Sequence, residues 1–97
     1  MKVPTYRISM NTAMEAFDEG ALILHLTGLS FYELNPTGRD ILKITDGKND
    51  IQQVARIIAH EYDIDPGLAL QDVTGLYQDL AKQGIVEMVP LIRKKAG

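Results

Sequence analysis

The apolar pattern of this chain changes its period at one dipeptide, Asn35-Pro36, and that change limits the possible folds more than any other feature. Before it, short apolar segments at 13–17, 21–26 and 30–34 read as strands separated by turn-forming residues. After it, apolar residues recur at helical spacing, and Asp65-Pro66 repeats the cap-plus-proline signal of a helix start. The sequence therefore predicts strands followed by helices, without the strand–helix alternation that a parallel sheet requires.

The three N-terminal segments predict an antiparallel meander. The turn formers at 18–20 and 27–28 leave room only for tight hairpins, which join antiparallel neighbours. The middle segment is apolar almost throughout, as in a central strand, and the third alternates in character. Because successive side chains of a strand point to opposite faces, we expect Tyr32 and Leu34 to face the helices.

The second half of the chain predicts three helices. The first runs from Pro36 to about Thr45 and stops at Asp46-Gly47, where glycine can adopt a left-handed conformation. The second begins near Asn49 or Asp50, each with a glutamine three residues later as in a capping box. Its predicted buried stripe consists of Ile51, Val54, Ala55, Ile58 and Tyr62.

The third helix begins after Asp65 and ends at Gly84, and a short extended segment could follow at 85–89. Helical spacing predicts a core stripe composed of Ala69, Val73, Leu76 and Leu80. The predicted fold class is α+β and winged-helix-like, with a three-stranded antiparallel sheet followed by a three-helix bundle. We expect a single domain over 1–97 with a core at about 13–89 and flexible ends.

Composition and missing motifs exclude most catalytic classes. The chain has no cysteine, and His25 and His60 lack the spacing of a zinc motif. It also lacks glycine-rich phosphate loops and a nucleophile elbow. We therefore expect no catalytic residue, no metal, no cofactor and no enzymatic activity. The absence of cysteine, of a signal peptide and of a membrane-length apolar run predicts a cytoplasmic protein without a membrane partner.

The third strand offers a candidate binding surface, because an edge strand exposes unpaired N–H and C=O groups that can accept another strand. The candidate residues in this strand are Ser30, Phe31, Tyr32, Glu33 and Leu34. A second wall is predicted on the third helix, on a face rotated away from the core stripe and formed by Leu70, Thr74, Tyr77 and Ala81. On this assignment Tyr77→Ala weakens leader binding and leaves the fold largely intact, whereas Leu76→Ala costs about 2 to 5 kcal/mol of stability.

Gly75 interrupts the third helix at a cost of about 1 kcal/mol relative to alanine, which indicates a close approach by a neighbour, such as the first helix.

Two other functions remain open at this stage. A winged helix could bind DNA, but the third helix carries Asp72 and Asp79 against the single basic residue Lys82, and the chain has a formal net charge of -3. We therefore expect no nucleic-acid partner. The exposed strand edge could instead pair with a second copy of the chain and form a homodimer.

The segments YELNPTGRDILKITDG, IQQVARIIAHEYDI and DVTGLYQDLAKQGIVE together resemble the PqqD-like family. Matching positions include Tyr32, Leu34, Asn35, Gly38, Ile41, Leu42, Asp46, Gly47, Asp72, Val73, Leu76, Leu80, Gly84 and Val86. The resemblance implies a peptide recognition element that binds the leader of a ribosomally made precursor and presents it to a modifying enzyme. In the pathway that names the family, the product is pyrroloquinoline quinone and the partner is a radical S-adenosylmethionine enzyme. The implied leader adds as a strand beside 30–34 and lies against the third helix.

Overall fold

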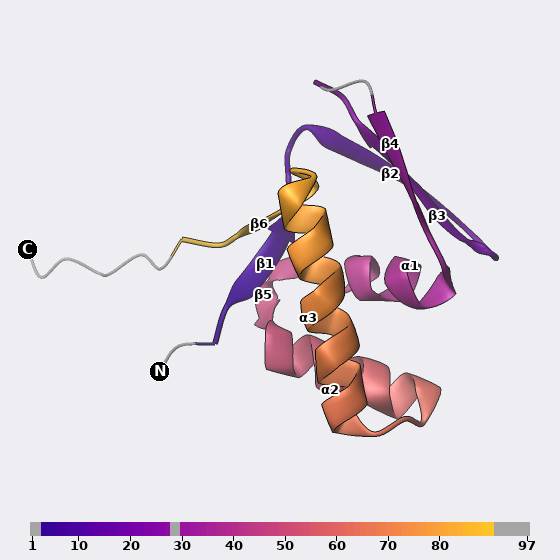
Figure 1. Ribbon diagram of the computed structural model, residues 1–97, viewed down its shortest axis with the longest axis vertical. Coiled ribbons are helices and arrows are strands. Elements are labelled where there is room, and N and C mark those ends of the chain that lie inside the picture. The colour runs from indigo at the N-terminus through magenta and orange to yellow at the C-terminus, as the bar shows by residue number, and fades with distance from the viewer. Residues whose placement is uncertain (1–2, 28–29, 91–97) are drawn as a thin grey trace, which may run out of the picture.

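The computed structural model describes residues 3–27 and 30–90, which form an α+β structure (Figure 1). Its strands are β1 Thr5–Ile8, β2 Thr12–Phe17, β3 Gly20–His25, β4 Ser30–Leu34, β5 Asp46–Asp50 and β6 Val86–Met88. Its helices are α1 Pro36–Lys43, α2 Ile51–Tyr62 and α3 Pro66–Lys82. The expected turn residue Gly28 and the outermost parts of the two termini lie outside the described residues. No helix in the described ranges is long and apolar enough to cross a membrane.

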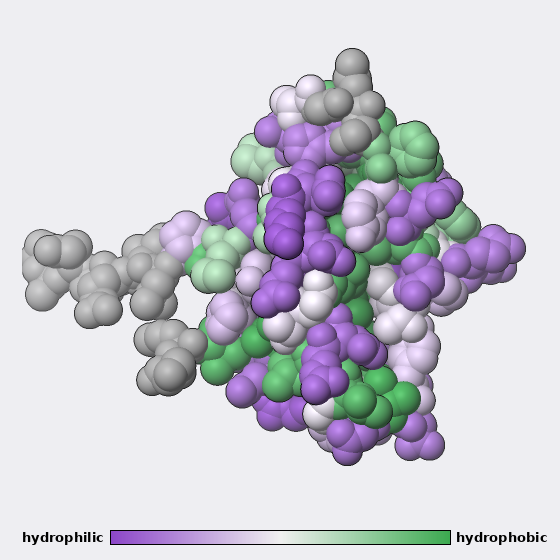
Figure 2. All heavy atoms as spheres, in the orientation of Figure 1, coloured by the Kyte–Doolittle hydropathy of each residue, from purple (hydrophilic) through white to green (hydrophobic). Residues whose placement is uncertain are grey.

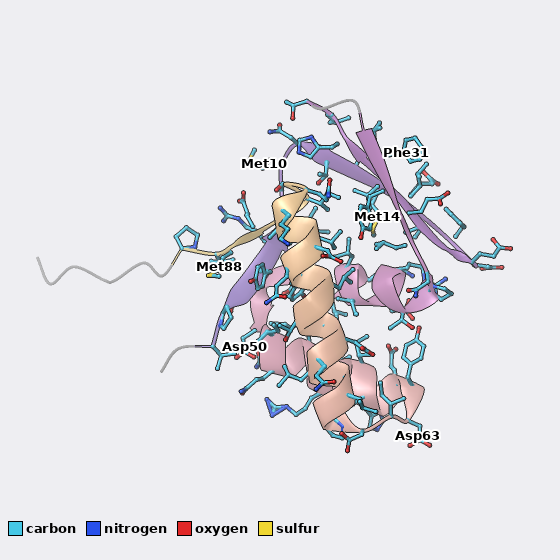
Figure 3. The ribbon with its side chains drawn as sticks, viewed as in Figure 1. Met10, Met14, Phe31, Asp50, Asp63 and Met88 are labelled. Carbon is cyan, nitrogen blue, oxygen red and sulfur yellow. The ribbon has the colours of Figure 1, made fainter. Side chains whose placement is uncertain are left out.

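The first sheet, ordered β2-β3-β4, is the antiparallel meander that the sequence predicts. Leu34 is buried and Tyr32 packs against the core, as expected from the alternation along β4. On the opposite face Phe31 is 67% exposed. Figure 3 shows Phe31 on the side of the sheet turned away from α3 and Met14 on the side that faces the helices.

Two glycines let the chain pack closely around the end of β4. Gly20 has a φ of +151°, and a Cβ there would lie 1.8 Å from the carbonyl oxygen of Leu34. At Gly38 a Cβ would lie 3.1 Å from Leu34 Cδ2. A larger residue at Gly20 would therefore force β3 and β4 apart, whereas one at Gly38 would require the Leu34 side chain to move by a few tenths of an ångström.

The second sheet, ordered β5-β1-β6, was not predicted from the sequence apart from a possible extended segment near β6. Its central strand, β1, pairs antiparallel with β5 and with β6, elements distant from it in the chain. The segment DGKND in β5 has no apolar alternation, so it shows no strand pattern of its own. Backbone pairing with β1 is what makes it a strand.

The helix starts follow the predicted capping chemistry. Asn35 caps α1 by accepting a bond from the Gly38 N–H at 2.8 Å. Asp50 caps α2 in a full capping box, in which Gln53 N donates to Asp50 Oδ1 at 2.9 Å and the Asp50 N–H donates to Gln53 Oε1 at 2.8 Å. Asp65 caps α3 through its side chain. These local bonds satisfy donors that no helix can pair internally, and they account for the agreement at the N-terminal helix boundaries.

The core stripes differ from the prediction at one position in each of two helices. In α2, Ala59 is buried and Tyr62 is 37% exposed. In α3, Tyr77 is 1% exposed and belongs to the core, whereas Leu76 is only partly buried. The reason for the second difference is the unpredicted sheet, which covers the flank of α3 on which Tyr77 lies.

Candidate peptide-binding groove

Strand β4 is the outer strand of its sheet and pairs only with β3 in the part of the chain that the structure describes. Beyond its end, a groove of about 480 Å³ separates the start of α1 from α3. The groove is lined by Asn35, Thr37, Gly38, Ile41, Gln71, Asp72, Gly75, Leu76 and Asp79. The groove begins at Asn35, directly after the end of β4, and α3 forms its far wall. A free strand edge close to such a hollow is an arrangement that suits strand addition.

Apolar side chains lie deep in this region and polar side chains rim it. Ile41 is buried and Leu76 is partly buried, while Asp72 and Asp79 are exposed. In Figure 2, hydrophilic side chains run along the outer face of α3, and hydrophobic atoms are visible between α3 and the β2-β3-β4 sheet. A guest entering here would exclude water from Leu76 while its polar groups stay near the rim.

Gly75 leaves space in the wall that α3 contributes. A Cβ built at Gly75 would meet no neighbouring atom within 4 Å, so neither α1 nor any other described element approaches it closely. The expected close neighbour is therefore absent among residues 3–27 and 30–90. A mid-helix glycine weakens the helix without improving any described packing contact, and its effect is to widen the groove.

The charge of the groove is acidic. Asp72 and Asp79 are the only charged residues that line it, and neither carboxylate has an ion pair among the described side chains. Asp40 of α1 is different, because the Arg39 guanidinium and the Tyr62 hydroxyl hold the pKa of that carboxyl below its usual range. Arg39 also donates to the carbonyl oxygens of Phe17 and Asp18 and so fastens α1 to the β2–β3 turn.

The helix residues assigned to the docking wall from the sequence do not line this groove. Leu70 lines a different hollow, against Ala55 and Arg56 of α2, and helical spacing sets Thr74 and Ala81 on the same flank as Tyr77. This flank lies on the other side of the core stripe from Gly75 and Leu76. Tyr77 is buried, so the expectation that it lies on an open face is wrong. Leu70, Thr74 and Ala81 are not buried, but they are not among the residues that line this groove.

Tyr77 is a core residue whose ring packs on another tyrosine and whose hydroxyl is hydrogen-bonded. Its ring centroid lies 4.5 Å from that of Tyr6 in β1. Thr45 Oγ1 donates to the Ile41 carbonyl at 2.6 Å, and because a hydroxyl has one hydrogen, the 2.6 Å contact with Tyr77 Oη has Tyr77 as donor. Burial raises the pKa of Tyr77 to about 12.

The residues that do face the groove from α3 were visible in the sequence only as isolated signals. In the sequence, Gly75 is an isolated mid-helix glycine, Asp72 and Asp79 make the helix acidic, and Leu76 falls on the predicted core stripe. Their spacing of three or four residues identifies one flank of a helix. Together, an unexplained glycine and unpaired carboxylates on that flank could have located the groove.

The site contains no obvious metal ligand set. Across the described ranges, no group of three or more His, Asp or Glu side chains is arranged to hold a metal ion.

The fold and the groove define a small α+β domain in which one sheet edge opens beside a helix-lined hollow. The chain belongs to the family of coenzyme PQQ synthesis protein D (PqqD), whose family model matches residues 20–86. It is also 30% identical over 56 residues to the bifunctional coenzyme PQQ synthesis protein C/D of Methylorubrum extorquens. That match covers 58% of this chain and 15% of the relative, so the chain spans a small part of the relative's length.

Solved structures share the fold at low sequence identity. TbiB1 in complex with the TbiA(beta) leader peptide matches with a TM-score of 0.76 and 21% identity, over 84% of this chain and 94% of that one. A lasso peptide synthetase B1 complexed with the leader peptide matches with a TM-score of 0.75 and 21% identity, over 88% and 98%.

A third structure is the PqqD truncation of Methylobacterium extorquens PqqCD, solved in solution by NMR. It represents a functional, stand-alone recognition element for ribosomally synthesized and post-translationally modified peptides. It matches with a TM-score of 0.72 and 23% identity, over 84% of this chain and 87% of that one. These three likenesses establish the α+β architecture of the family for this chain.

Proposed function

We propose that this protein binds the leader segment of a ribosomally synthesised precursor peptide as an added strand and presents it to a modifying enzyme. The leader pairs with the free edge of β4, Ser30–Leu34, and lies in the groove against Gly75 and Leu76 of α3. The observation that carries the proposal is this free edge beside a groove in which a helical glycine leaves open space. Family membership and the leader-bound relatives of the same fold support it.

In this role the protein acts by binding and the partner enzyme supplies the chemistry. The partner is a peptide-modifying enzyme, and in a pyrroloquinoline quinone pathway it is a radical S-adenosylmethionine enzyme. Such a protein works in the cytoplasm, where ribosomes release the precursor. We also propose that 1–97 is one recognition domain and that the order α1-β5-α2-α3-β6 is winged-helix-like, used for a peptide instead of DNA.

The test is an NMR titration of the full ¹⁵N-labelled chain with a synthetic peptide that has the leader sequence of the precursor encoded beside this chain's gene. We expect the largest amide shifts at 30–34 and at 72–79, and new protection of β4 amides against hydrogen exchange. A saturating titration that leaves these amides unchanged would refute the site. A scrambled peptide of the same composition is the control.

The free β4 edge also supports a second candidate, a homodimer in which two β4 edges pair. Light scattering over a range of concentrations separates the two. A molar mass that doubles as concentration rises, and that leader peptide does not reverse, favours the homodimer.

A further inference from the structure

We propose that the groove selects leader segments in which an apolar residue has lysine or arginine two positions away, because the α3 wall presents a central apolar contact between two unpaired carboxylates. This inference rests on the proposed strand addition and specifies the chemistry of the guest. The two carboxylates are Asp72 and Asp79, and Leu76 and Gly75 lie between them.

The spacing along α3 fits an extended guest. At 1.5 Å per residue, Leu76 lies about 6 Å along the helix from Asp72, and Asp79 lies about 4.5 Å further. Side chains on one face of a strand recur about every 6.7 Å. A guest side chain seated on Leu76 therefore has neighbours two residues away that approach Asp72 and Asp79, and the flexible stems of lysine and arginine accommodate the remaining mismatch.

The other face of the guest meets the same combination of groups. On β4, Phe31 is 67% exposed and Glu33 is exposed next to it on the same face of the sheet. The residue of β3 that pairs with Glu33 is Leu22, which is apolar, and Leu22 in turn pairs with Glu15 of β2. No basic side chain is paired with Glu33 among the described residues. A strand added to β4 thus gains apolar contact with Phe31 and attraction for a basic side chain beside Glu33.

Helix geometry gives Asp79 only a weak local role, an i,i+3 spacing to Lys82 that is set against the helix dipole. Asp79 lies in the last turn of α3, which ends at Lys82, and a negative charge is unfavourable near the negative end of the helix dipole. Asp79 is exposed and bonds no described side chain, so it contributes nothing visible to packing. Its carboxylate is therefore available to attract a positively charged guest.

A display experiment tests the charge preference with a defined probe. A phage library of random peptides is selected in parallel on the full wild-type chain and on the Asp72→Lys/Asp79→Lys variant. We expect wild type to enrich an apolar residue with lysine or arginine two positions away, and the variant to enrich aspartate or glutamate there. Glu15→Lys/Glu61→Lys, which makes the same change of net charge at exposed positions that do not line the groove, is the control and should select like wild type.

A second measurement gives the size of the effect. For a peptide selected on wild type, neutralising each carboxylate as Asp72→Asn or Asp79→Asn should weaken binding about two- to fivefold, with the loss shrinking in high salt. Asp79→Asn removes an unfavourable charge from the helix end, so it should not unfold the chain.

The outcomes separate this inference from the proposed function. Peptides that shift β4 and groove amides but show no basic preference overturn the inference and leave strand addition standing. A preference that changes equally in the control variant also overturns it, because the cause is then net charge. If no enriched peptide shifts those amides, both proposals fail.

Discussion

The two flanks of α3 differ in what covers them. On one flank Tyr77 packs on Tyr6 and bonds Thr45, and the sheet β5-β1-β6 covers it. On the other, Gly75 and Leu76 face a groove of about 480 Å³ between α3 and α1. On the covered flank the large side chain of Tyr77 is buried and its hydroxyl is hydrogen-bonded, whereas the open flank carries a glycine, a partly buried leucine and carboxylates without an ion-pair partner among the described residues. The difference shows that one helix can serve as a core element and as a binding wall, separated only by a rotation about its axis.

The strongest test of this comparison is truncation of the covered flank. Tyr77→Ala should lower the free energy of unfolding by about 3 to 5 kcal/mol, because it removes a buried ring and leaves a cavity beside Tyr6. Leu76→Ala, on the open flank, should lower the free energy of unfolding by clearly less than Tyr77→Ala does. Relative to that loss of stability, it should weaken leader binding more than Tyr77→Ala. Urea denaturation measures the first quantity and peptide titration the second. Equal destabilisation by both variants would contradict the flank assignment.

Alkaline pH provides a second test of the covered flank. Burial raises the pKa of Tyr77 to about 12 from the usual 10, so the folded state retains a proton that the unfolded state releases. The free energy of unfolding is therefore unaffected by this hydroxyl below pH 10. It falls as pH rises from 10 toward 12, by about 2 to 3 kcal/mol in all.

The comparison variant is Tyr77→Phe, which should be about 1 kcal/mol less stable than wild type near neutral pH, because it lacks the bond to Thr45. Its deficit should shrink and then reverse between pH 10 and 12. Urea melts at matched pH values measure the difference, in which the other titrating groups largely cancel. A difference that does not change with pH would mean that Tyr77 is not desolvated.

The smallest expected effect on stability belongs to the open flank and has the opposite sign. Gly75→Ala should stabilise the free protein by up to about 1 kcal/mol, because alanine favours the helix and its Cβ meets no atom within 4 Å. The same methyl group narrows the groove, so leader binding should weaken. Thermal melting and peptide titration on one sample detect both changes, with Gln78→Ala on the exposed surface as the control. A variant that binds as tightly as wild type would show that no guest approaches Gly75.

Local sequence signals predicted most of the regular structure. The three strands of the first sheet and the caps of the helices rest on neighbouring residues, such as the Asp50–Gln53 capping box, so a single stretch of sequence contains all the information needed. The inward orientation of Tyr32 and Leu34 followed from strand alternation in the same way. For the candidate site, the edge position of strand 30–34 was predicted from the sequence and is confirmed by the sheet order, but the burial of Tyr77 was not predicted.

What the sequence by itself determined is therefore the type, order and starting points of the elements from β2 to α3, apart from β5, together with family membership. Tertiary structure alone decided the second sheet and the rotation of α3 about its axis. Strands β1 and β6 lie at opposite ends of the described chain, and β5 has no strand pattern of its own. Only non-local pairing brings them together, and this sheet then buries Tyr77 and leaves Gly75 facing the groove. A helical stripe defines a face only to within a residue or two, so the neighbour that covers the helix determines which flank remains open.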